Sequence, residues 1–125
     1  MTTSDLPTRT SADEALDRDA LTLTTRTGRD GTVTVSVAGE VDTFTAPTLR
    51  SAVDAALERR PPALVLDLRG VRFLGSAGLA LLVETQKSAD ARGLALRLIA
   101  TTRPVTRPLE VTELLPLFTI TGDLR

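Results

Sequence analysis

The feature that most restricts the fold of this chain is a short run, ALVLDL at residues 63–68, which is continuously apolar at its centre and has Asp67 as its only polar residue. A run without polar alternation is typical of a central strand that is covered on both faces. Segments with helical spacing of apolar residues come before and after it, at 45–60 and 77–91. Since a strand between two helices is the pattern of parallel crossover connections, these segments predict a layered α/β sheet.

Shorter elements extend this pattern towards both ends of the chain. Residues 21–39 alternate apolar and polar side chains on each side of Asp30-Gly31, which predicts a hairpin with a tight turn. The later elements are a strand at 94–100, a short helix at 103–114 and a last strand at 116–120. The expected fold is a single α/β domain with the order β-β-α-β-α-β-α-β, a mixed β-sheet and helices packed on it.

The helical spacing also predicts which side chains face the sheet. In the first long helix these are Leu49, Val53, Ala56 and Leu57, and in the second they are Leu79, Leu82 and Val83. Thr45 is the expected N-cap of the first helix, where Pro47 is tolerated in the first turn.

The start of the chain differs in composition from the rest. Residues 1–18 are rich in Thr, Ser, Asp and Arg and carry no periodic apolar face, which is typical of a flexible tail. The segment DEALDRDA at 13–20 can form one exposed helical turn at most. We therefore expect a flexible N-terminal tail over 1–18 and the folded domain over 19–125.

Two residue types that are missing from the composition exclude most enzyme chemistry. The chain has no His and no Cys, so it can form neither a Ser-His-Asp triad nor the usual zinc sites. We expect no enzyme, no metal and no cofactor. A net charge of −1 and only three aromatic residues argue against a nucleic-acid partner. No apolar run approaches the ~20 residues of a membrane span, and the absence of Cys is compatible with the cytoplasmic location that we expect.

The stretch GSAG at 75–78 places one hydroxyl, that of Ser76, where the second long helix begins. The stretch is not a phosphate-binding loop, because the Lys that would hold a nucleotide is absent. Two interpretations remain open. Ser76 can be an N-cap that accepts a hydrogen bond from a first-turn amide. It can also be a phosphorylation site, because a helix N-terminus stabilises a phosphate.

A second polar cluster follows the predicted hairpin. Glu40 and Asp42 lie close together at the expected end of a strand, which is compatible with a metal site or with acid–base chemistry. The alternative is a polar turn in which Asp42 or Thr43 organises the loop that leads into the first helix. We favour the turn, because no other fixed oxygen ligands lie nearby in the sequence.

Taken in order, the segments AGEVDTFTAPTLR at 38–50, LVLDLRGVRFLGSAGLALLVE at 64–84 and LEVTEL at 109–114 resemble the STAS domain family, and within it the bacterial anti-sigma factor antagonists. The resemblance covers about residues 19–121. It implies a small α/β domain without catalytic activity that binds an anti-sigma factor which is also a serine kinase. The resemblance implies that the unphosphorylated antagonist binds the anti-sigma factor and so releases the sigma factor. Phosphorylation of the antagonist blocks this binding, and a phosphatase restores it.

The resemblance also assigns residues. The phosphorylated Ser or Thr of the family falls on Ser76, and the acidic residue of its Gly-Glu-Leu-Asp segment falls on Asp42. The expected partner-binding residues are Glu40, Asp42, Thr43, Gly75, Ser76, Ala77 and Gly78.

The chain departs from the family pattern at three positions. Gly75 stands where an Asp is usual, Ala77 replaces a second hydroxyl, and Glu113 stands where a helix-ending Gly is usual. The change at Gly75 leaves an alternative open, in which the domain is a non-phosphorylated STAS docking module in a larger regulatory or lipid-transport assembly.

Overall fold

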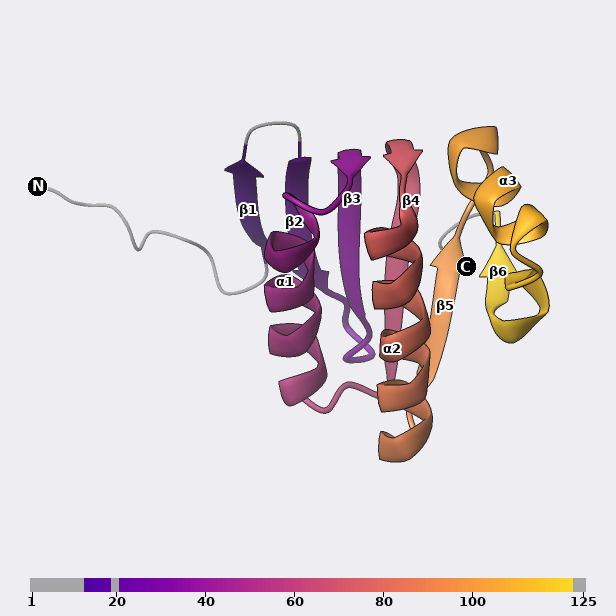
Figure 1. The fold of residues 1–125 in the computed structure, drawn as a ribbon. Helices are drawn as coiled ribbons and strands as arrows, with labels where there is room; N and C mark the ends of the chain where they lie inside the picture. Colours follow the sequence, from indigo (N-terminus) through magenta and orange to yellow (C-terminus); the bar gives the residue numbers. More distant parts are fainter. Residues whose placement is uncertain (1–12, 19–20, 123–125) are drawn as a thin grey trace, which may run out of the picture.

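A single mixed β-sheet forms the centre of the computed structural model, which describes residues 13–18 and 21–122. Its strands are β1 (Asp13–Arg18), β2 (Leu21–Thr27), β3 (Val33–Val41), β4 (Ala63–Leu74), β5 (Ala95–Ile99) and β6 (Thr119–Thr121). They lie side by side in the order in which they occur along the chain (Figure 1). The pairs β1–β2 and β2–β3 are antiparallel, and the three later pairs are parallel.

The predicted hairpin is confirmed. Strands β2 and β3 pair from Leu21 opposite Gly39 to Thr27 opposite Val33. In the turn between them, the Thr32 N–H donates to Asp30 Oδ1 at 2.9 Å, and Gly31 has a φ of 88°. A positive φ is favourable for glycine, so the Asp-Gly pair supplies what this turn requires.

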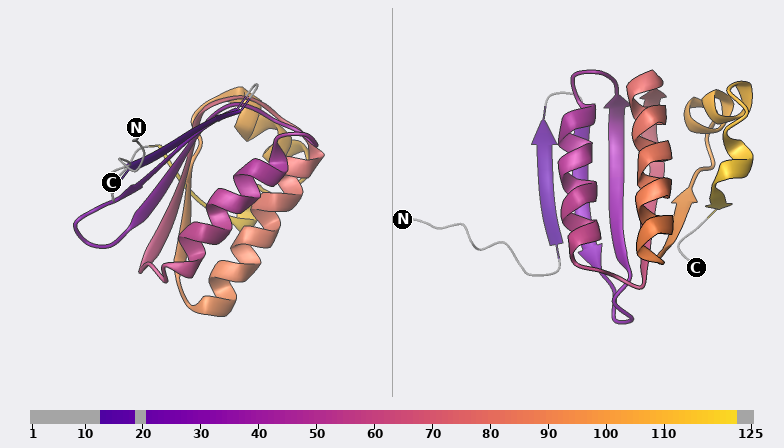
Figure 2. Two further views of the ribbon diagram at one scale, coloured as in Figure 1. Left: turned by 90° about the vertical axis from the view of Figure 1, so that its left-hand side faces the viewer. Right: turned by 60° about the horizontal axis from the view of Figure 1, so that its bottom comes forward.

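Two helices cover one face of the sheet. Helix α1 (Ala46–Glu58) connects β3 to β4, and helix α2 (Ser76–Arg92) connects β4 to β5. Both lie on the same side, in front of the sheet in Figure 1 and to one side of it in the edge-on view of Figure 2. The core between these layers contains Leu64, Leu66 and Leu68 of β4, each about 1% exposed or less.

The buried faces of the two helices agree with the spacing to different extents. In α1 the buried residues are the four that the sequence predicts, Leu49, Val53, Ala56 and Leu57. In α2 they are Gly78, Leu81, Leu82, Thr85 and Ala89. The expected Leu79 and Val83 are only partly buried and pack at the margin of the core. The buried face of α2 thus combines Leu81 and Leu82 with the small residues Gly78 and Ala89, at which the helix can approach the sheet closely.

The C-terminal region is more irregular. Helix α3 (Arg103–Val111) buries Val105 and Leu109 and contacts β4, beside whose upper end it lies in Figure 1. A 3₁₀ helix, η2 (Leu115–Leu117), then leads into β6. The last strand is thus shorter than the predicted 116–120, because residues 115–117 turn instead of extending.

The prediction for the N-terminal tail needs a correction. Residues 13–18 form β1 and pair along their whole length with β2, where the sequence indicated one helical turn at most in a flexible tail. The rest of the predicted tail, residues 1–12, lies outside the described residues, and so do 19–20 and 123–125. Within the described part of the chain, no helix is long and apolar enough to cross a membrane.

Candidate partner-binding site

The two segments that the sequence analysis singled out meet at one end of the sheet. Strands β3 and β4 are parallel neighbours that end together, with Val41 paired to Leu74. Immediately beyond this pair, the Gly75 N–H donates a hydrogen bond of 2.9 Å to the Val41 carbonyl oxygen. The turn that follows β3 and the start of α2 are therefore held next to each other, at the end of the sheet where both arrows point in Figure 1.

Ser76 is not the N-cap of α2, contrary to one of the two interpretations of the sequence. Gly75 occupies the N-cap position with extended backbone angles, φ −91° and ψ −175°, and no side chain caps the helix. The helix opens with a 3.0 Å bond from the Leu79 N–H to the Gly75 carbonyl oxygen. Ser76 is the first helical residue and is exposed. Within the described residues, its hydroxyl has no hydrogen-bond partner.

The start of α2 is electrostatically suited to an anion. The first amides of a helix have no intrahelical partner, and the helix dipole places partial positive charge on them. In α2 no side chain caps these amides, and the first turn carries no acidic residue. A negative group on the Ser76 side chain would therefore meet favourable charge from its own helix.

Gly78 faces the core rather than a partner. It is buried, and a Cβ at this position would lie 2.5 Å from Leu74 Cδ1 and 2.8 Å from Val41 Cγ1. Both distances are too short for real contacts. Gly78 thus lets the first turn of α2 lie directly on the ends of β3 and β4. Ala77, beside it, is half-buried.

The polar turn after β3 is organised by Asp42, as we predicted. Its Oδ1 accepts hydrogen bonds from the Phe44 N–H at 2.9 Å and the Thr45 N–H at 3.0 Å. The buried Thr45 hydroxyl accepts from the Asp42 N–H at 2.9 Å and donates to the Glu40 carbonyl oxygen at 2.7 Å. Thr45 stands at the N-cap of α1, but its hydroxyl bonds to the turn and not to a helix amide. Thr43 is exposed.

Glu40 lies on the sheet face opposite the two long helices. Along β3 the residues alternate between buried and half-buried from Val33 to Val41, and Glu40 belongs to the half-buried set. Its neighbour on β4 is Phe73. In the described part of the chain, no group of three or more acidic, His or Cys side chains could hold a metal ion.

Sequence reasoning missed the two exposed aromatic residues of this region. Phe44 in the turn is 90% exposed, and Phe73 near the end of β4 is 52% exposed. The available signal was that two of only three aromatic residues fall within the two motif segments. A bulge between β3 and β4 at Gly39 and Glu40 shifts the alternation, so the sequence alone did not indicate that Phe73 points outward.

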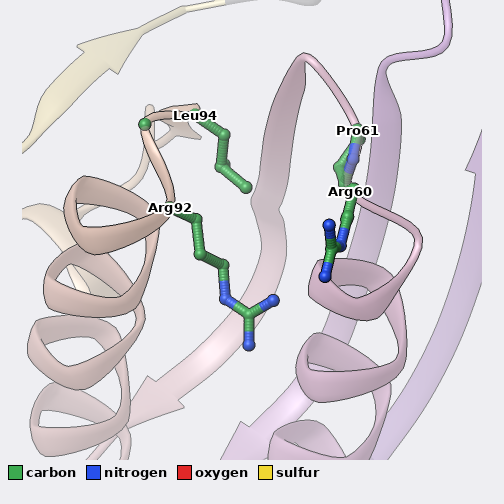
Figure 3. Close-up of a pocket in the computed structure, with 5 residues that line it drawn as sticks. Arg60, Pro61, Arg92 and Leu94 are labelled. Carbon is green, nitrogen blue, oxygen red and sulfur yellow. The ribbon is translucent and has the colours of Figure 1, made fainter.

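A cavity of about 260 Å³ lies at the opposite end of α2, lined by Arg60, Pro61, Arg92, Gly93 and Leu94 (Figure 3). Arg92 extends from the end of α2 towards α1 and donates a 3.4 Å hydrogen bond to the Leu57 carbonyl oxygen. Arginines at helix C-termini interact favourably with the helix dipole, which explains this pair. Because α2 has 17 residues, the cavity is about 25 Å from Ser76 and separate from the site.

The turn after β3 and the start of α2 thus bring the exposed Phe44 and Ser76 to the same end of the sheet, and the comparisons give the family of this domain. The STAS domain family model matches residues 24–125, and the chain belongs to this family. RsfB, an anti-sigma-F factor antagonist of Mycobacterium tuberculosis, is 36% identical over 90 residues, which cover 70% of this chain and 73% of RsfB. An anti-sigma-B factor antagonist of Listeria monocytogenes is 32% identical over 82 residues, covering 66% of this chain and 72% of that protein.

A solved structure agrees with these relatives. The crystal structure of an anti-sigma factor antagonist from Mycobacterium paratuberculosis matches with a TM-score of 0.74 and 36% identity, over 84% of this chain and 88% of that chain. These relatives are named as antagonists of regulatory factors and not as enzymes.

Proposed function

We propose that this chain is an anti-sigma factor antagonist of the kind that phosphorylation switches off. Unmodified, it binds an anti-sigma factor of the serine-kinase type in the cytoplasm, so that the sigma factor is released. Phosphorylation of Ser76 by that kinase ends the binding, and a phosphatase restores it. The observation that carries the proposal is the unengaged, exposed hydroxyl of Ser76 at the first position of α2.

Electrostatics explains why one phosphate would affect binding without unfolding the domain. Phosphorylation adds about 1.5 to 2 negative charges at pH 7. The uncapped amides and the dipole of α2 favour these charges in the free protein. In a complex the same group would be removed from water, which is costly unless the partner supplies matching positive charge. The modification therefore acts on the bound state more than on the folded state.

The Gly at position 75 is compatible with this proposal. Position 75 is the N-cap of α2, where Asp and Gly are both accepted residues. Replacing the usual Asp by Gly therefore preserves the start of the helix and the placement of Ser76. With Ala77 next to it, Ser76 is the only hydroxyl in the motif.

The same Gly75 is the observation that favours a second candidate function. If the carboxylate of the usual Asp takes part in phosphoryl transfer, this chain would be modified slowly or not at all. It would then dock without regulation in a larger regulatory or lipid-transport assembly.

The experiment compares wild-type protein with Ser76→Ala and Ser76→Asp as baits in lysate of the native cell, followed by mass spectrometry. We expect wild type and Ser76→Ala to capture an anti-sigma factor and Ser76→Asp to capture at least tenfold less. The purified anti-sigma factor with ATP should then label wild type at Ser76 and leave Ser76→Ala unlabelled. Equal capture by all three baits, with no label at Ser76, would contradict the switch and favour the docking module.

Stability measurements supply the control for this experiment. Since Ser76 makes no capping bond, Ser76→Ala should change the free energy of unfolding by no more than ~0.5 kcal/mol, as exposed substitutions do. Ser76→Asp should unfold at the same temperature or slightly higher, because an acidic residue is favourable in the first turn. Binding is therefore compared only between variants whose unfolding temperatures show that they are folded.

A further inference from the structure

Two exposed phenylalanines lie on the two segments that carry Asp42 and Ser76. In the described residues, the large hydrophobic side chains that are exposed are Phe44, Phe73, Val111 and Leu117. The first two belong to the turn after β3 and to the end of β4, which the bond from Gly75 to Val41 holds side by side. Exposed apolar groups that cluster around polar ones are typical of a binding surface.

The backbone that carries Phe44 is fixed before any partner arrives. The Asp42 carboxylate accepts a 2.9 Å hydrogen bond from the Phe44 N–H itself and a 3.0 Å bond from the next amide, that of Thr45. Thr45 is 6% exposed and anchors the turn in the core, while Phe44 is 90% exposed. The ring is thus presented on an ordered turn, which reduces the entropy that binding would cost.

The ring of Phe73 lies directly over Gly75. A Cβ on Gly75 would be 3.1 Å from Phe73 Cε2 and 3.4 Å from Phe73 Cζ, so the ring would have to move by a few tenths of an ångström to admit a side chain at position 75. Gly75 is the N-cap of α2 and precedes Ser76. The Phe73 ring therefore borders the residue that we propose to be phosphorylated.

We propose that Phe44 and Phe73 are the apolar anchors through which the anti-sigma factor docks, an inference that rests on the proposed function. A buried Phe covers roughly 200 Å², so at exposures of 90% and 52% the two rings offer about 280 Å². That area is about a third of the ~800 Å² that one partner contributes to a standard interface. Aromatic residues are also enriched in such interfaces, where few residues carry most of the affinity.

The arrangement links the anchors to the switch. A partner that covers the Phe73 ring also approaches Ser76, because the ring lies close to Gly75, the residue before Ser76. A phosphate at Ser76 keeps its hydration and holds water at the margin of this apolar surface. The affinity comes from the rings and the regulation from the hydroxyl, because both occupy the same end of the sheet.

The test measures the dissociation constant of the full-length chain for the purified anti-sigma factor identified with the baits above, by isothermal titration calorimetry. We expect Phe44→Ala and Phe73→Ala each to weaken binding at least tenfold. Phe44→Leu, which keeps an apolar side chain on the turn, should lose less than Phe44→Ala. The matched control is Leu117→Ala, an apolar residue on η2 that is about as exposed as Phe73, which should change affinity less than twofold.

The outcomes separate this inference from the proposed function. If wild type binds the anti-sigma factor and both alanine variants bind as wild type does, the anchors are wrong and the proposed function stands. If wild type does not bind it, the proposed function itself fails. If the rings instead hold a second copy of this chain, wild type dimerises in analytical ultracentrifugation, Phe44→Ala is monomeric and affinity for the anti-sigma factor is unchanged, which also overturns the inference.

Discussion

Substitution of Gly78 by alanine tests how α2 is seated on the sheet. A Cβ at this position would lie 2.5 Å from Leu74 Cδ1 and 2.8 Å from Val41 Cγ1. Both neighbours are in the core, Val41 at 0% and Leu74 at 5% exposure. Val41 is β-branched and has little rotamer freedom, so it cannot turn aside easily. The added methyl group must therefore displace the first turn of α2 or the end of β3.

Two effects of opposite sign decide how much Gly78→Ala changes the free energy of unfolding. Alanine is better than glycine inside a helix by about 1 kcal/mol. Overpacking of a filled core costs about 1–3 kcal/mol. Since both obstructing side chains are buried, we expect the packing cost to exceed the helix preference. The net result is a loss of about 1 kcal/mol in the free energy of unfolding, or about 4 °C in Tm for a chain of this size.

Thermal and urea unfolding followed by circular dichroism measure this change. The matched control is Ala80→Gly, at an exposed position two residues along the same helix. It should lose about 1 kcal/mol from helix preference alone. The packing argument thus predicts that exchanging Ala and Gly in either direction destabilises the protein. A Tm for Gly78→Ala above that of wild type would refute it, because helix preference would then be the only effect.

Two further predictions concern a strained residue and a titrating one. Glu113 has a φ of 61°, a left-handed conformation that glycine adopts at low cost. Glu113→Gly should therefore raise the free energy of unfolding by about 1 kcal/mol, while Glu113→Ala should give no such gain. Thermal unfolding of both variants measures the difference. Hydrogen bonds from the Arg69 side chain to both carboxylate oxygens of Asp67, at 2.9 and 2.7 Å, lower the pKa of Asp67. Because the folded-state pKa is below the ordinary value of about 3.9, the stability that the Asp67 carboxylate adds is complete above that pH and is lost as the pH falls through the lower value. Wild type should therefore be more stable than Asp67→Asn at pH 6, and the difference should shrink by pH 3; a difference that stays constant over this range would contradict the assignment.

The parts of the fold that the sequence predicted are those with strong local patterns. Three features follow from patterns within a few residues: the buried face of α1, the Asp30-Gly31 turn and the largely apolar run in β4. Strand β1 could not be predicted in this way. Its sequence, DEALDR, has no apolar alternation of its own, and its conformation depends on pairing with β2.

The candidate site was predicted as a pair of segments but not in its details. Strands β3 and β4 are parallel and adjacent, so the residues after them had to meet at one edge. The helix start was misplaced by one residue, since Ser is usually a better N-cap than Gly and only the backbone angles of Gly75 decide the matter. The outward orientation of Phe73 depends on a bulge, which shifts the alternation without a clear signal in the sequence.

The structure gives the two glycines around Ser76 separate roles. Gly78 has no side chain because Val41 and Leu74 fill the space beneath it. At Gly75 the absence of a side chain leaves room for the Phe73 ring, although the backbone angles of this position would suit other residues. Neither glycine is needed to uncover the hydroxyl, whose exposure follows from the first helical position. Restoring the usual acidic residue with Gly75→Asp would therefore do more than add a carboxylate. Its Cβ would lie 3.1 Å from the Phe73 ring, which would have to move aside, and its charge would lie beside that apolar side chain. If Phe73 is an anchor, this substitution should weaken binding even where it speeds phosphorylation. In Gly75→Asp, the affinity for the anti-sigma factor should then fall while the rate of phosphorylation at Ser76 rises.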